Sequence, residues 1–111
     1  MREFMLITKA LADENRVRML LALRDGELCV CQITELFGLA PSTISKHLSI
    51  LYHAGLAEAR KNGRWMHYRL PGKGASPAVR GAIDWVVESV RGNEGVARDA
   101  ARLKKILAMD P

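Results

Sequence analysis

Residues 30–55 read VCQITELFGLAPSTISKHLSILYHAG and decide the fold. A short apolar helix is predicted from about residue 30 to 37, and Gly38 ends it. A second helix is predicted from Pro41, since proline suits the first turn of a helix, and it stops before Gly55. Two helices joined by a three-residue turn that starts with glycine are typical of a helix-turn-helix, which we place at about residues 30–54.

The next stretch, about residues 56–70, reads LAEARKNGRWMHYRL and predicts a β-hairpin. Asn62-Gly63 between two alternating segments is a strong signal for a two-residue turn. The expected cross-strand pairs are Lys61–Arg64, Ala59–Met66, Ala57–Tyr68, Glu58–His67 and Arg60–Trp65. We expect Arg60 to stack on Trp65. A hairpin directly after a helix-turn-helix is the chain order of a winged helix-turn-helix.

Apolar residues recur at helical spacing in four other segments. These segments are about residues 2–12, 14–24, 77–92 and 94–109. With 111 residues the chain is long enough for one compact domain and too short for two. The predicted fold class is therefore mainly α with a β-hairpin wing, in a single domain that spans residues 1–111.

Positive charge is concentrated in the region that carries the predicted helix and wing. The formal net charge is +5, and residues 40–70 hold five bases and one acid, so the rest of the chain nets only +1. A basic excess confined to one segment is the pattern expected of a face that binds nucleic acid.

In a helix-turn-helix the second helix enters the major groove of DNA. Ile44, Leu48 and Leu51 should pack inward, which leaves the hydroxyls and the lysine of the first turns facing outward. The candidate DNA-binding residues are Ser42, Thr43, Ser45, Lys46 and His47 on this helix and Lys61, Asn62, Gly63 and Arg64 at the wing tip. His47 is interpreted as a packing or phosphate-contacting residue. The alternative is that Ser42 and Thr43 only cap the helix and Lys46 is only solvated.

The two cysteines of the chain, Cys29 and Cys31, stand one residue apart at the start of the first of these helices. On a regular helix this spacing corresponds to a rotation of about 200°, whereas in an extended chain both side chains share a face. A soft metal ion needs both sulfur atoms at one point. We therefore expect metal capture to require an unwound first helical turn and so to compete with the geometry that fits DNA.

The runs ELCVC, STISKHLSIL and GRWMHYRL resemble the ArsR/SmtB family of metalloregulatory repressors, and most of all its arsenic-sensing members. The resemblance covers about residues 5–70. It implies a homodimer closed by the helices at about 2–12 and 77–92, and a double-stranded operator with dyad symmetry. It also implies release of that operator when As(III) or Sb(III), as effector, binds Cys29 and Cys31, with no obligatory cofactor and no enzymatic activity.

Two departures from the family pattern bear on the ligand. Thr34 stands where arsenic sensors of this type often carry a third cysteine. Zinc, nickel or cobalt sensors of the family use Asp and His on the penultimate helix, and here that helix offers Asp84 and Glu88 without a histidine. A zinc or cadmium sensor is therefore disfavoured.

Other readings of the cysteine pair stay open. The thiols could form a redox switch on the same DNA-binding fold, or they could be structural in a ligand-independent regulator. Outside this class, a small thiol-disulfide exchange enzyme would also use two nearby thiols, but the sequence offers no further catalytic cluster. No apolar run approaches the length of a membrane span, and we expect a cytoplasmic protein.

Overall fold

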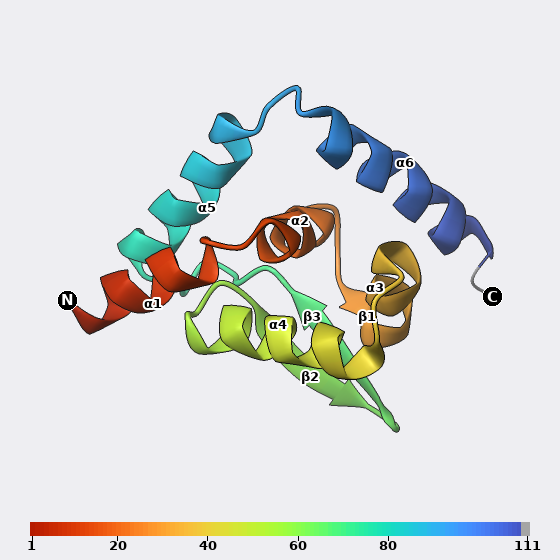
Figure 1. Cartoon of the computed structure of the whole chain (residues 1–111). Coiled ribbons are helices and arrows are strands. Elements are labelled where there is room, and N and C mark those ends of the chain that lie inside the picture. The colour runs from red at the N-terminus through yellow and green to blue at the C-terminus, as the bar shows by residue number, and fades with distance from the viewer. Residues whose placement is uncertain (110–111) are drawn as a thin grey trace.

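The computed structural model describes residues 1–109, and within them it has six helices and a three-stranded sheet (Figure 1). The elements are α1 (Arg2–Ala10), α2 (Glu14–Ala22), β1 (Leu28–Cys29), α3 (Val30–Phe37), α4 (Pro41–His53), β2 (Glu58–Asn62), β3 (Trp65–Arg69), α5 (Pro77–Ser89) and α6 (Glu94–Met109). The predicted class, mainly α with a β-hairpin wing, is confirmed.

The helix-turn-helix consists of α3 and α4. Gly38 follows α3 with φ 65°, a left-handed conformation that glycine adopts without steric cost, and α4 starts at Pro41. Ile44, Leu48 and Leu51 are fully buried, so the predicted inward face of α4 is correct. Burial of this face fixes α4 against the core and turns its opposite face to solvent.

The wing is a hairpin as predicted, but the predicted register is wrong. The structure pairs Asn62 with Trp65, which makes Gly63 and Arg64 the two turn residues. Gly63 has φ 65° and no non-glycine residue of the described chain has positive φ. A single positive φ at the first loop position fits a type II′ turn. The Asn-Gly dipeptide is instead typical of a type I′ turn, which needs positive φ at both loop positions.

The correct register moves each strand partner by two residues. Glu58 lies opposite Arg69 instead of His67, and His67 lies opposite Arg60. The predicted Arg60–Trp65 stacking is absent from the described structure, because Arg60 pairs with an acid outside the hairpin. A shift of two residues preserves the alternation of faces, so each residue of the hairpin still lies on the face predicted for it.

A third strand, β1, was not predicted. It is two residues long and pairs antiparallel with β3, which places β3 between β1 and β2. Leu28 and Cys29 are both buried. The first cysteine therefore belongs to the sheet of the wing, and the second belongs to α3.

The remaining helices lie around this unit. α1 and α5 contact each other at one end of the molecule, while α6 runs across α2 and α3 (Figure 1). Arg18 of α2 holds α6 through two hydrogen bonds of 2.7 Å to the carboxylate of Asp99, which raise the pKa of the guanidinium. Arg18 also lies over the ring of Phe37, 4.7 Å from its centroid, so one side chain connects α2, α3 and α6.

Candidate DNA-binding surface and metal site

The exposed face of α4 carries the predicted base-reading residues. Ser42, Thr43, Ser45 and Lys46 are all exposed, and α4 has no side-chain hydrogen bond at its N-terminus in the described structure. The hydroxyls of Ser42 and Thr43 are thus not used as caps. They remain available to accept or donate hydrogen bonds at an external surface.

His47 occupies a different environment from its neighbours on α4. It is half-buried, and its Nδ1 atom lies 3.2 Å from Nη1 of Arg16. The same guanidinium donates to the carbonyl oxygens of Ala10 at 2.8 Å and Lys9 at 3.0 Å, at the end of α1. Arg16, which sequence reasoning missed, therefore connects α1 to α4.

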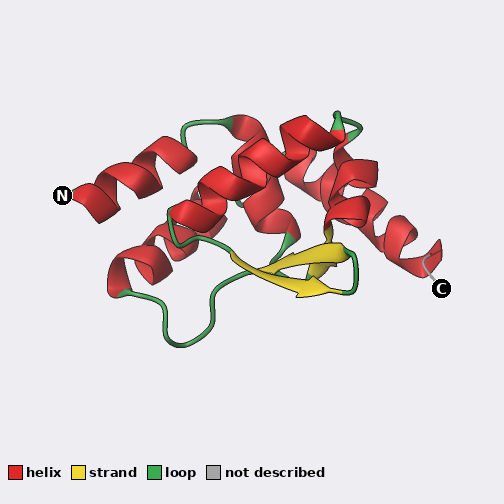
Figure 2. Ribbon diagram, turned by 90° about the horizontal axis from the view of Figure 1, so that it is seen from below, coloured by secondary structure: helices red, strands yellow, loops and turns green. Residues whose placement is uncertain are grey.

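The wing tip forms a second basic surface on the same side of the molecule as α4 (Figures 1 and 2). Lys61, Asn62, Gly63 and Arg64 are all exposed. Neither Lys61 nor Arg64 takes part in an ion pair in the part of the chain that the structure describes. Their charges are thus not compensated within residues 1–109, as an anion-binding tip requires.

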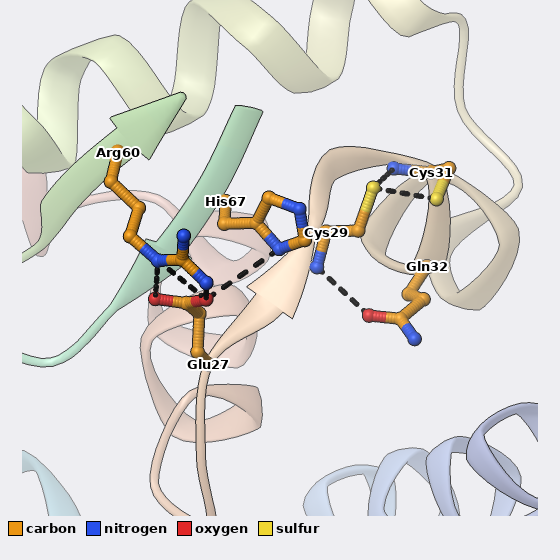
Figure 3. Close-up of polar contacts among 6 residues, drawn as sticks. All are labelled: Glu27, Cys29, Cys31, Gln32, Arg60 and His67. Carbon is orange, nitrogen blue, oxygen red and sulfur yellow. Dashed lines mark hydrogen bonds and ion pairs between the residues drawn. The ribbon is translucent and has the colours of Figure 1, made fainter. Parts of the chain in front are cut away.

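The two cysteines converge, and Figure 3 shows how. Cys29 is the residue that precedes α3, with extended backbone angles (φ −72°, ψ 146°), and its Sγ atom accepts a hydrogen bond from the backbone N–H of Cys31 at 3.3 Å. The Sγ atoms lie 2.6 Å apart, and no disulfide joins them. Cys29 is buried and Cys31 is exposed, so the pair is open to solvent on one side.

This geometry corrects the predicted conflict between metal capture and the helix. We expected the sulfur atoms to diverge as on one regular helix, although the helix itself was predicted to start at about residue 30, after Cys29. In the structure α3 begins at Val30, after Cys29, and its first turn is intact while the sulfur atoms point to one place. Unwinding of α3 is therefore not required for both sulfur atoms to face a common ligand.

The donor set suits a soft ion in part. Thiolates are the ligands that soft metals prefer, and bonds of about 2.3 Å at a tetrahedral angle would need the sulfur atoms roughly 3.8 Å apart. Among residues 1–109 no group of three or more His, Cys, Asp or Glu side chains is arranged to hold a metal ion.

Thr34 does not supply the missing donor. Its hydroxyl donates to the carbonyl oxygen of Val30 at 2.8 Å, within α3. The acidic residues considered for zinc are no better placed, because Asp84 is exposed and Glu88 forms an ion pair with Arg91 at 2.7 Å. Any third ligand to Cys29 and Cys31 would come from outside these side chains.

A charged network, also missed from the sequence, lies beside the cysteines (Figure 3). Glu27 accepts hydrogen bonds from Arg60 through Nε, at 2.9 Å to each carboxylate oxygen, and through Nη2 at 2.6 Å. These bonds hold the pKa of Glu27 below its ordinary value and raise that of Arg60. His67 adds a contact of 3.6 Å from Nδ1 to the same carboxylate. No local sequence signal marks this pair, since 33 positions separate its members.

These features define a winged helix-turn-helix DNA-binding protein. A family model described as "Bacterial regulatory protein, arsR family" matches residues 13–59. The arsenic resistance transcriptional regulator ArsR1 of Pseudomonas putida is 38% identical over 112 residues, which covers 96% of this chain and 84% of that protein. The chain belongs to the ArsR family of transcriptional regulators and is not an enzyme.

Two further similarities refine this placement. The arsenical resistance operon repressor of Escherichia coli is 46% identical over 63 residues, 56% of this chain and 54% of that protein. The solved homodimeric winged helix-turn-helix domain of Mb0332 from Mycobacterium bovis, described as a possible ArsR-family regulator, is 32% identical with a TM-score of 0.66 and covers 81% of this chain and 82% of that one. Within residues 1–109, no helix combines the length and apolar character needed to span a bilayer.

Proposed function

We propose that this protein is a homodimeric repressor that binds a dyad-symmetric operator in the cytoplasm and leaves it when trivalent arsenic or antimony binds Cys29 and Cys31. The observation that carries the proposal is the convergence of the two sulfur atoms at the junction of β1 and α3. Relatives named as regulators of arsenic resistance support the choice of ion.

The proposed DNA-reading residues are the exposed residues of α4 and the wing tip. They are Ser42, Thr43, Ser45, Lys46, His47, Lys61, Asn62, Gly63 and Arg64. Hydroxyls and Lys46 on the exposed face of α4 suit base edges and phosphates, and the uncompensated charges of Lys61 and Arg64 suit the DNA backbone. His47 is held by Arg16, so in this proposal its first role is to fix α4 relative to α1.

The proposed dimer uses α1 and α5, at about residues 2–12 and 77–92. Phe4 is 60% exposed and Met5 46% exposed on α1, and Trp85 is 66% exposed on α5. Large apolar side chains left in water on two adjacent helices are typical of a surface that binds another protein chain. The homodimeric relative supports a second copy of this chain as that partner.

In the proposed mechanism Cys29 and Cys31 act as the sensor because they connect the two DNA-reading elements. Cys29 pairs with His67 in β3, so it belongs to the wing sheet, and Cys31 lies in α3, which packs on α4. A ligand that holds both sulfur atoms at its own spacing would displace this junction. A coupling free energy of about 3 kcal/mol would weaken operator binding roughly 150-fold.

The test is operator binding by mobility shift with arsenite, antimonite, zinc and cadmium in turn. We expect release by arsenite and antimonite in the parent, and retention of the complex by Cys29→Ser and Cys31→Ser. Release of both variants at the same arsenite concentration as the parent would contradict the sensor assignment.

Thr34→Cys supplies a gain-of-function variant. Position 34 lies one turn after Cys31 on α3, where side chains three residues apart are neighbours. A third thiolate should therefore lower the arsenite concentration needed for release, whereas Thr34→Ser, which keeps the hydroxyl, should not.

If peroxide releases the operator, a reductant restores binding and arsenite has no effect, the pair is a redox switch.

A further inference from the structure

The bridge between Glu27 and Arg60 spans the sheet in a direction that backbone pairing does not provide. Glu27 immediately precedes β1, Arg60 lies in β2, and β3 separates the two strands. The three hydrogen bonds of 2.6 to 2.9 Å thus tie β1 directly to the non-neighbouring strand. No other ion pair of the described chain connects β1 or its flanking residue to β2.

The bridge lies on the face of the sheet that also carries the first cysteine. Cys29 is opposite His67, and His67 is opposite Arg60, so these three side chains point to the same face. Glu27 is two residues before Cys29 and therefore reaches the same side. Figure 3 shows Glu27 below the ring of His67, with Arg60 on one flank and Cys29 on the other.

β1 is joined to the wing by its short backbone pairing with β3 and by the Glu27–Arg60 bridge to β2. It has only two residues and two paired positions, too few to form a stable strand alone. Arg60, in turn, is the residue directly before the wing-tip residues Lys61–Arg64. A displacement of Cys29 can therefore reach the tip through one bidentate ion pair.

We infer that the Glu27–Arg60 bridge transmits the state of the cysteine pair to the DNA-binding wing, with both residues in a positioning role. This inference rests on the proposed function, since it names the route by which ligand binding at Cys29 and Cys31 changes the wing. An exposed ion pair contributes little to the free energy of unfolding. Its importance here is geometric, because it restricts β1 and β2 to a common movement.

Movement of the wing can be measured in the absence of DNA. The chain contains two tryptophans, Trp65 in β3 opposite Asn62 and Trp85 on α5. Incorporation of 5-fluorotryptophan gives one fluorine resonance for each, and Trp65→Phe identifies the wing signal. In the parent protein we expect arsenite to shift the Trp65 resonance, with Trp85 as the internal reference.

Glu27→Gln should remove at least half of that arsenite-induced shift. The matched control is Glu58→Gln, which breaks the other acid–arginine pair of the sheet, Glu58–Arg69 at 3.0 Å, without touching β1. This control should retain the shift. The exchanged pair Glu27→Arg with Arg60→Glu should recover it, because attraction between positions 27 and 60 is restored.

A second measurement separates transmission from ligand capture. Arsenite binding to the free protein, followed by thiolate absorbance, should stay within about twofold in Glu27→Gln, while the ratio of operator dissociation constants with and without arsenite should fall from about 150 toward 10 or below. An unchanged Trp65 shift and an unchanged ratio in Glu27→Gln would overturn the inference alone. A parent protein that neither binds arsenite nor releases DNA would overturn the proposed function and the inference together.

Discussion

Removal of the charges at the wing tip should change the salt dependence of operator binding by a calculable amount. Lys61 and Arg64 are exposed and have no ion-pair partner within residues 1–109, so each is available for one phosphate. In a dimer, Lys61→Gln with Arg64→Gln removes four such contacts. At about 0.9 per phosphate, the slope of log K against log salt should become shallower by about 3.6. Between about 50 and 200 mM salt, the fold-loss of operator affinity should therefore be roughly 150 times smaller for the variant than for the parent.

The assay is a salt titration of fluorescence anisotropy with labelled operator. The matched control is Lys104→Gln with Lys105→Gln, which removes the same charge from exposed positions on α6, remote from the wing. We expect the slope of this control to equal that of the parent. An equal change of slope in both double variants would mean that net charge, and not contact by the wing, governs binding, and an unchanged slope in the wing variant would refute the assignment of the tip.

Three other predictions concern single positions. Leu48→Ala removes a fully buried side chain of α4 and should lower the free energy of unfolding by about 2–5 kcal/mol in urea denaturation. His47→Asn keeps an acceptor for Arg16 and should hold operator affinity within about threefold of the parent, whereas His47→Gln should lower operator affinity about tenfold. The reverse order of the two variants would favour a direct DNA contact through Nε2. Because Arg60 lowers the pKa of folded Glu27, this pair stabilises the fold above the ordinary carboxyl range and the contribution disappears as pH falls through the lowered pKa. The difference in unfolding free energy between parent and Glu27→Gln should therefore shrink from neutral pH to about pH 3.

The sequence predicted those parts of the fold that local chemistry determines. Gly38, Pro41 and the apolar spacing of Ile44, Leu48 and Leu51 define both helices of the DNA-reading unit, because caps and periodicity act within a few residues. Gly63 predicted a hairpin for the same reason. The register of the hairpin depended on whether one or two turn residues have positive φ, and the Asn62-Gly63 dipeptide alone does not decide this.

The features that the sequence did not predict depend on contacts between distant positions. β1 exists only because Leu28 and Cys29 lie against β3, about 40 residues later, and two residues carry no periodicity of their own. Glu27–Arg60 and Arg16–His47 likewise join separate elements. The residue types of the candidate sites were recognisable, whereas the partners that orient them required the fold.

The position of Cys29 has a consequence for how a two-thiol site could act as a switch. This residue ends β1 and precedes α3, its N–H donates to Oε1 of Gln32 at 2.8 Å, and its Sγ accepts from Cys31. Its backbone is thus held by the helix on one side and by the sheet on the other. Cys29 is 94% buried, so its sulfur atom has little room to rotate, whereas the exposed side chain of Cys31 can turn toward a common ligand. Strain that rotation of Cys31 does not relieve passes into β1 or into α3, and because α3 is fixed by α6 and by Arg18 stacked on Phe37, the two-residue strand is the element with less resistance.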